Sequence, residues 1–155
     1  MRRFLIATAA LLSLAAPAVA VPACSNPADQ SAWEVLALRR MMSVIATKNC
    51  GKEREYNEYF IKRFQPIIQD NDRKVQAYFR RVYGGAGRGR MDIFETELAN
   101  IMSQQANRQA GEFCSRASLM FNEMLALPKQ DDLAAYAAVK DLPPPNVSMC
   151  PTVRR

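Results

Sequence analysis

Histidine is absent from this chain of 155 residues. Because histidine is the only side chain that titrates near neutral pH without help from its surroundings, its absence excludes Ser-His and Cys-His hydrolases and metal sites built on imidazole. The chain also lacks a GxSxG motif, an SxxK motif and a phosphate-binding loop of the Walker type. Any catalysis would have to use carboxylates, tyrosine or lysine, and the sequence predicts no metal and no cofactor.

Runs of alternating Val, Ile and Thr are missing as well, whereas apolar residues recur at intervals of three and four almost throughout. This spacing is typical of amphipathic helices. We therefore predict an all-α fold, a small antiparallel bundle of three long helices and one short C-terminal helix. The domain should cover residues 21–142, followed by an extended proline-rich tail over 143–155.

The chain also lacks an apolar run of the roughly 20 residues that a membrane-spanning helix needs. Its first 20 residues instead have the pattern of an export signal, with Arg2 and Arg3 before a short apolar stretch and small residues before a cleavage site after Ala20. We expect a periplasmic or secreted mature chain without a transmembrane segment. Removal of the two arginines would reduce the formal net charge from +6 to +4.

No two of the four cysteines, Cys24, Cys50, Cys114 and Cys150, form a CxxC motif. An even number of cysteines in an exported chain predicts disulfides, here two. Lipidation of Cys24 is the alternative that the sequence leaves open.

The boundaries of the predicted helices follow from capping residues and breakers. The first helix should run from Pro27, with Asn26 as N-cap, to about Lys48. The second should run from about Lys52 to Val82, and Pro66 either bends it or breaks it, in which case Asp70 would cap a second segment.

A glycine-rich segment, Gly84–Gly89, predicts a loop, because so many glycines do not hold a helix. The third helix should then open at Asp92, with Glu95 completing a capping box, bend or face solvent over its polar middle (103–111) and end at Pro128. The short helix should cover Asp131 to about Lys140.

Helix length restricts the cysteine pairing. A continuous first helix would hold Cys24 and Cys50 about 35 Å apart, whereas a disulfide needs Cα atoms within about 7 Å. Antiparallel packing brings Cys114 nearer to Cys50, and the C-terminal tail returns Cys150 toward Cys24. We predict the pairs Cys50–Cys114 and Cys24–Cys150.

The best candidate site is a basic ridge opposite the apolar stripe of the second helix, continued into the glycine-rich segment. Guanidinium groups offer charge and forked donors, which suit carboxylate or phosphate partners. A solvated helix face is the alternative. The ridge comprises Tyr59, Lys62, Arg63, Arg73, Arg80, Arg81, Arg88 and Arg90.

These patterns predict a non-enzymatic exported binding protein, whose partner is a protein or an anionic polymer of the cell envelope. Nucleic acid is not expected, because exported proteins rarely meet it. One alternative is a cell-wall glycan hydrolase that uses a carboxylate pair, and another is a carrier of an apolar small molecule between the helices. The glutamates available for such a pair are Glu53, Glu55, Glu58, Glu95 and Glu97.

Overall fold

The computed structural model describes residues 24–48, 50–140, 142, 147 and 150. These residues form helices and no strand, which confirms the all-α bundle. The expected leader (1–20) lies outside the described residues, as does the expected tail (143–155) apart from Val147 and Cys150. The elements are α1 (Pro27–Thr47), the π-helical segment η1 (Glu55–Ile61), α2 (Lys62–Tyr83), the 3-10 turn η2 (Gly84–Ala86), α3 (Gly87–Leu125) and α4 (Asp132–Val139).

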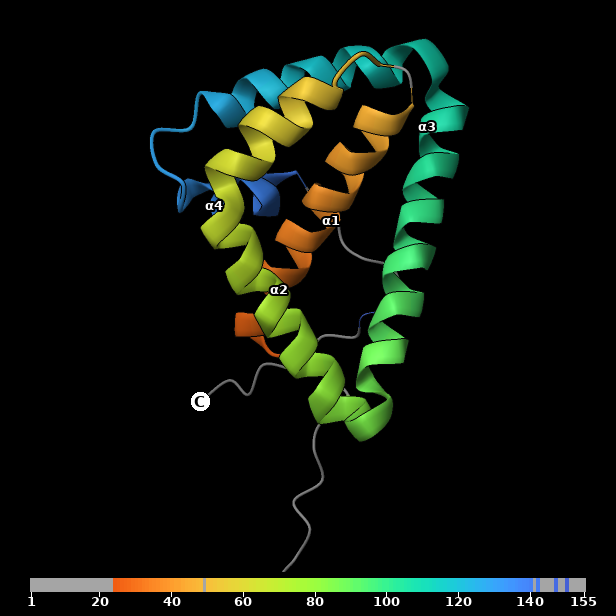
Figure 1. Ribbon diagram of the computed structural model, residues 1–155, viewed down its shortest axis with the longest axis vertical. Coiled ribbons are helices and arrows are strands. Elements are labelled where there is room, and N and C mark those ends of the chain that lie inside the picture. The colour runs from red at the N-terminus through yellow and green to blue at the C-terminus, as the bar shows by residue number, and fades with distance from the viewer. Residues whose placement is uncertain (1–23, 49, 141, 143–146, 148–149, 151–155) are drawn as a thin grey trace, which may run out of the picture.

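α1 is the central helix and packs against α2, α3 and α4 (Figure 1). The predicted cap begins it, since the Asn26 side chain accepts the Asp29 N–H at 2.8 Å and the Asp29 carboxylate accepts the Asn26 N–H at 3.2 Å. Apolar residues are buried on nearly every side of the helix, as expected of a helix enclosed by others. They are Ala32, Trp33, Val35, Leu36, Ala37, Leu38, Met41, Met42, Val44, Ile45 and Ala46.

The second helix bends at Pro66 and is not broken there. α2 runs through Pro66, and Figure 1 shows the ribbon changing direction between its yellow and green parts. Proline cannot donate to the carbonyl four residues back, and its ring crowds that carbonyl, so a bend is the usual response. The π-helical segment η1 lies directly before this bend.

The prediction of a loop over Gly84–Gly89 is wrong. Only η2 separates α2 from α3, and the helix already begins at Gly87, so Asp92 lies inside α3 and is not its cap. Gly84 adopts a φ of 56°, which closes the turn at little steric cost. At Gly87 the backbone of α3 approaches α2 so closely that a Cβ atom would lie 2.7 Å from the carbonyl oxygen of Phe79. Gly87 therefore permits a close helix–helix contact.

Substitution of Gly87 by alanine is expected to lower the free energy of unfolding by about 1–3 kcal/mol, because the added methyl group meets backbone that cannot move aside. Gly89→Ala is the matched control, since nothing lies within 4 Å of a Cβ there. It should be neutral or stabilise the helix by up to about 1 kcal/mol. Urea unfolding of both variants compares them, and equal midpoints would contradict the close contact.

α3 is a single element of 39 residues that covers two sides of the bundle. Figure 1 shows it rising along one side and then changing direction at the top, in its teal part, as expected for the polar middle of this helix. The predicted short helix is confirmed as α4, which packs against α1.

Both predicted disulfides are confirmed. Cys50 pairs with Cys114 at a Cα–Cα distance of 5.3 Å, and Cys24 pairs with Cys150 at 4.8 Å. The backbone N–H of Cys150 also donates to the Ser25 carbonyl at 2.8 Å. Two disulfides are typical of proteins that function in oxidising compartments.

Candidate functional site

Two members of the predicted basic ridge bind elements of their own chain. The Arg63 guanidinium donates to the carbonyl of Leu125 at 3.1 Å and to that of Leu127, and so satisfies acceptors at the end of α3. Arg81 forms an ion pair of 2.7 Å with Asp29 in the first turn of α1. These two arginines connect helices and are half-buried, which a helical wheel of α2 alone does not reveal.

The other members of the ridge lie on the exposed surface but do not form one patch. Arg73 pairs with Asp70 at 3.2 Å. Tyr59 and Lys62 are exposed near the start of the bent helix, and Lys62 is about 27 Å of helix length away from Arg80. The ridge is therefore divided along α2.

Four residues of the α2–α3 hairpin form two neighbouring pairs, and we call them the basic tip: Tyr83 with Arg90, and Arg80 with Arg88, which line one cleft. Tyr83 is 45% exposed and stacks on Phe79 with ring centroids 5.8 Å apart. The Arg90 guanidinium lies 5.7 Å from the centre of the Tyr83 ring, within the range of a cation–π contact. The three arginines are exposed, and within the described part of the chain none of them has a carboxylate partner.

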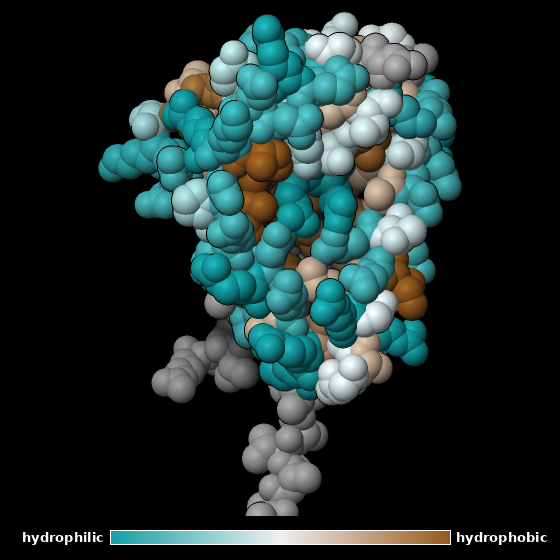
Figure 2. All heavy atoms as spheres, in the orientation of Figure 1, coloured by the Kyte–Doolittle hydropathy of each residue, from teal (hydrophilic) through white to brown (hydrophobic). Residues whose placement is uncertain are grey.

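A cleft of about 490 Å³ lies beside the basic tip, between α2 and α3. Figure 2 shows a hollow on this face in which hydrophilic side chains predominate. A second hollow of about 380 Å³ continues along α3 and shares Asp92 and Glu95 with the first. The first is lined by Asp72, Gln76, Phe79, Arg80, Gly87, Arg88, Met91, Asp92 and Glu95.

Two arginines of α1, which the sequence analysis did not single out, contribute to this region. Arg39 pairs with Asp72 at 2.6 Å and lies 3.7 Å from Glu95, which also pairs with Arg40. The Nε atom of Arg40 is buried and has no hydrogen-bond partner among the described residues. Two adjacent charges within the mostly apolar stretch 35–46 are the sequence signal that would have indicated them.

Burial shifts the proton affinities of this network. Loss of hydration raises the pKa of the Asp72 carboxyl, against the opposing effect of Arg39. Burial likewise lowers the pKa of the Arg40 guanidinium, and the neighbouring charge of Arg39 adds to this effect. Both groups are thus poorly hydrated, and their ion pairs offset part of the cost of burying them.

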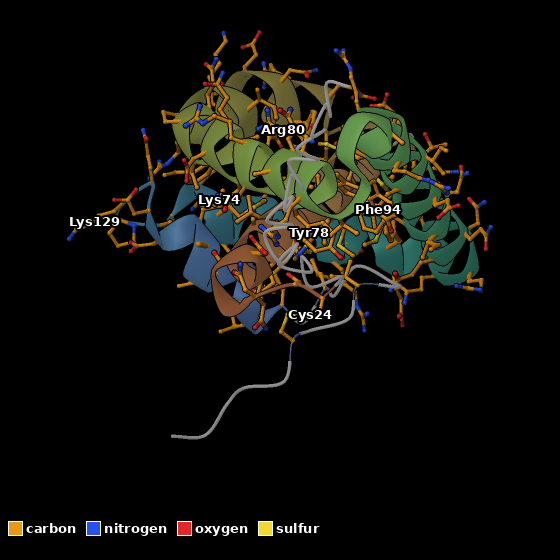
Figure 3. All side chains as sticks on the ribbon, turned by 90° about the horizontal axis from the view of Figure 1, so that it is seen from below. Cys24, Lys74, Tyr78, Arg80, Phe94 and Lys129 are labelled. Atoms are coloured by element: carbon orange, nitrogen blue, oxygen red, sulfur yellow. A yellow bond between two sulfur atoms is a disulfide. The ribbon has the colours of Figure 1, made fainter. Side chains whose placement is uncertain are left out.

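An aromatic cluster supports the cleft from the core side. Trp33 makes edge-to-face contacts with Tyr78, Phe79 and Phe94 at centroid distances of 5.1 to 5.8 Å. Figure 3 shows Tyr78 and Arg80 on opposite sides of α2, so one helix carries both the core contact and the charged surface. Phe79 belongs to the cluster and also lines the cleft.

Two of the five glutamates considered for a glycan hydrolase, Glu55 and Glu95, form ion pairs with basic side chains. Glu95 belongs to the network with Arg39 and Arg40. A hydrogen bond from Lys52 lowers the pKa of Glu55, whereas a general acid in glycan hydrolysis needs a raised pKa. Glu53, Glu58 and Glu97 are exposed.

An apolar hollow of about 270 Å³ bears on the alternative of a small-molecule carrier. It lies between α1, α3 and α4 and is lined by Met41, Ile45, Gln105, Gln109, Phe113, Arg116, Ala117, Met120, Lys140 and Leu142. The ammonium of Lys140 already pairs with Glu123 at 2.6 Å. At this volume the hollow is below the usual range for drug-sized ligands, about 300–1,000 Å³.

Within residues 24–48 and 50–140, no cluster of three or more Cys, Asp or Glu side chains is arranged to hold a metal ion. None of the helices in the same part of the chain combines the length and hydropathy needed to cross a membrane. Comparison with protein-family models, curated proteins and solved structures finds no match for this chain.

Proposed function

We propose that the protein is an exported, non-enzymatic binding protein that docks a partner protein on the basic tip. Arginine and tyrosine are enriched where protein interfaces gain most of their binding energy. The observation that carries the proposal is a half-exposed, stacked tyrosine with Arg90 over its ring, next to Arg80 and Arg88 at the neighbouring cleft. None of the three arginines has a carboxylate partner within the described chain. A partner that presents carboxylates would supply the missing counter-charges.

The order of the tip before binding supports this role. Tyr83 is held between Phe79 and Arg90, and the turn beneath it is closed by the contact at Gly87. Side chains that are already ordered lose less conformational entropy on association, which favours affinity.

A protein partner fits this surface better than an anionic polymer. Asp92 is exposed one helical turn after Arg88, and Glu95 and Asp72 line the adjoining cleft. A uniformly negative chain would meet repulsion from the carboxylate of Asp92, which has no ion pair with any described residue, whereas a protein surface with charges of both signs would not. Export is part of the proposal, and it rests on the leader pattern of the sequence together with the two disulfides.

Site-specific photo-crosslinking in intact cells tests the proposal. A benzophenone side chain at position Ile93, which is 54% exposed and follows Arg90 by one helical turn, should give one adduct of defined mass. The triple substitution Arg80→Ser, Arg88→Ser and Arg90→Ser should reduce this adduct about tenfold or more, because several interface arginines are lost at once. Added salt should weaken it as well.

Two controls separate the tip from general surface charge. Arg73→Ser, Lys74→Ser and Lys129→Ser remove the same charge elsewhere on the exposed surface and should leave the adduct unchanged. A crosslinker at Val139 of α4, which is 77% exposed, should not produce it. An adduct that survives the tip substitutions, or that forms equally from Val139, would refute the basic tip as the docking site.

A further inference from the structure

The cleft between α2 and α3 has the size of a small-ligand site. Its volume of about 490 Å³ lies within the range of roughly 300–1,000 Å³ that is usual for ligand pockets. Buried Phe79 and Met91 give it an apolar part, and Gln76 adds an amide group. The cleft could thus enclose a molecule the size of a short peptide, whereas a flat docking surface could not.

The charges that line the cleft fall into two groups. Asp72 and Glu95 are paired with Arg39 and Arg40 of α1 and are therefore not free to bind a ligand. Arg80, Arg88 and Asp92 are exposed and make no ion pair with any described residue. The lining therefore offers two cations and one anion to a ligand.

The chemistry of these groups specifies the class of ligand. Arg88 and Asp92 are one turn apart on α3, about 6 Å along the helix, and Arg80 faces them from α2. A carboxylate would bind the forked donors of the arginines, and an ammonium would bind Asp92. Between the two charges, an apolar side chain would contact Phe79 and Met91.

We propose that this cleft binds a short zwitterionic peptide, with its carboxylate on Arg80 and Arg88 and its ammonium on Asp92. The site shares Arg80 and Arg88 with the basic tip but takes a different class of ligand, and it does not require a partner protein to dock there. A peptide of two or three residues has a size that a cleft of about 490 Å³ can enclose.

A titration followed by NMR tests the proposal on the oxidised mature protein. The probe is alanyl-leucyl-alanine in three forms: unmodified, N-acetylated and C-amidated. The unmodified peptide should shift the backbone amide signals of Gln76, Gly87 and Met91 in a saturable manner. Each blocked form should bind at least about tenfold more weakly, because each lacks one of the two charge-assisted contacts.

Substitutions in the cleft sharpen the test by a crossed design. Asp92→Asn should abolish the difference between the unmodified and acetylated peptides while keeping the penalty for amidation. The double variant Arg80→Gln and Arg88→Gln should abolish the difference between the unmodified and amidated peptides while keeping the penalty for acetylation. Asp131→Asn and Arg73→Gln, which lie outside the cleft, are the matched controls and should change neither difference.

The outcomes decide the proposal without reference to any partner protein. Circular dichroism first establishes that each variant retains its helices and its melting midpoint. Absence of saturable shifts with the unmodified peptide at about 10 mM, or equal affinity for the three forms, would overturn the peptide site. The proposal would also be overturned if the acetylated and amidated peptides bound the cleft variants more weakly than the unmodified peptide by the same factors as they do the unsubstituted protein.

Discussion

Replacement of Trp33 by alanine is expected to lower the free energy of unfolding by about 3–5 kcal/mol. Trp33 is the only tryptophan of the chain and is 2% exposed in the first half of α1. It contacts Tyr78 and Phe79 of α2 and Phe94 of α3, so its removal leaves a cavity where three helices meet. Small domains are stable by only about 5–15 kcal/mol, so this single change removes a large share of the total.

Two milder variants separate packing from hydrogen bonding at this position. The indole Nε1–H donates to the Ser25 hydroxyl at 2.8 Å in a buried site. Ser25→Ala should cost about 1–3 kcal/mol, because it leaves the indole donor without its acceptor, and Trp33→Phe should fall between this variant and alanine.

Urea unfolding followed by far-UV circular dichroism measures all three variants, since tryptophan fluorescence is lost in two of them. A cost below about 1 kcal/mol for Trp33→Ala would contradict the central packing of this side chain.

Removal of the Cys50–Cys114 disulfide is expected to cost about 4 kcal/mol. The two cysteines are 64 positions apart, and closing a loop of that length restricts the unfolded chain by about this amount in the chain-entropy account. The bridge joins Cys50, which is partly buried against the core in the short segment between α1 and η1, to the second half of α3. Its loss therefore relaxes mainly the unfolded state.

The Cys24–Cys150 disulfide should contribute less, although it closes the longer loop, of 126 positions. Cys24 precedes α1 and Cys150 lies beyond α4, so the bridge joins residues outside the four α-helices and its loss leaves the packing between those helices in place. The native state then gains entropy too, which offsets part of the gain of the unfolded state. The serine pairs at positions 50 and 114 and at 24 and 150, compared by thermal unfolding, test this order. A larger loss from the second pair would contradict it.

Local features of the chain predicted the helices well because their causes are local. Asn26 and Pro27 begin α1 through contacts within one turn, and the apolar spacing of α4 is complete within eight residues. The bend at Pro66 follows from the missing N–H and the ring of that residue. The disulfide pairing followed from the rigid length of a helix, which separates Cys24 from Cys50.

The glycine-rich segment is an exception, because its conformation depends on a tertiary contact. Its composition predicted a loop, because glycine is unfavourable in an isolated helix. The structure uses Gly87 for close contact with the carbonyl of Phe79, and α3 begins there. The packing of the two helices outweighs the low helix propensity of glycine. The residues adjacent in sequence do not indicate that packing.

The residues of this chain determined by themselves the helical class, most helix ends and the two cystine pairs. Only the tertiary structure decided which arginines are available: Arg63 and Arg81 bind α3 and α1, whereas Arg80 and Arg88 remain open beside the cleft. It also placed Arg39 and Arg40 of the central helix beneath that cleft. The physical reason is that helix formation depends on contacts within a few residues, whereas the partner of a long charged side chain is chosen by elements far away in sequence.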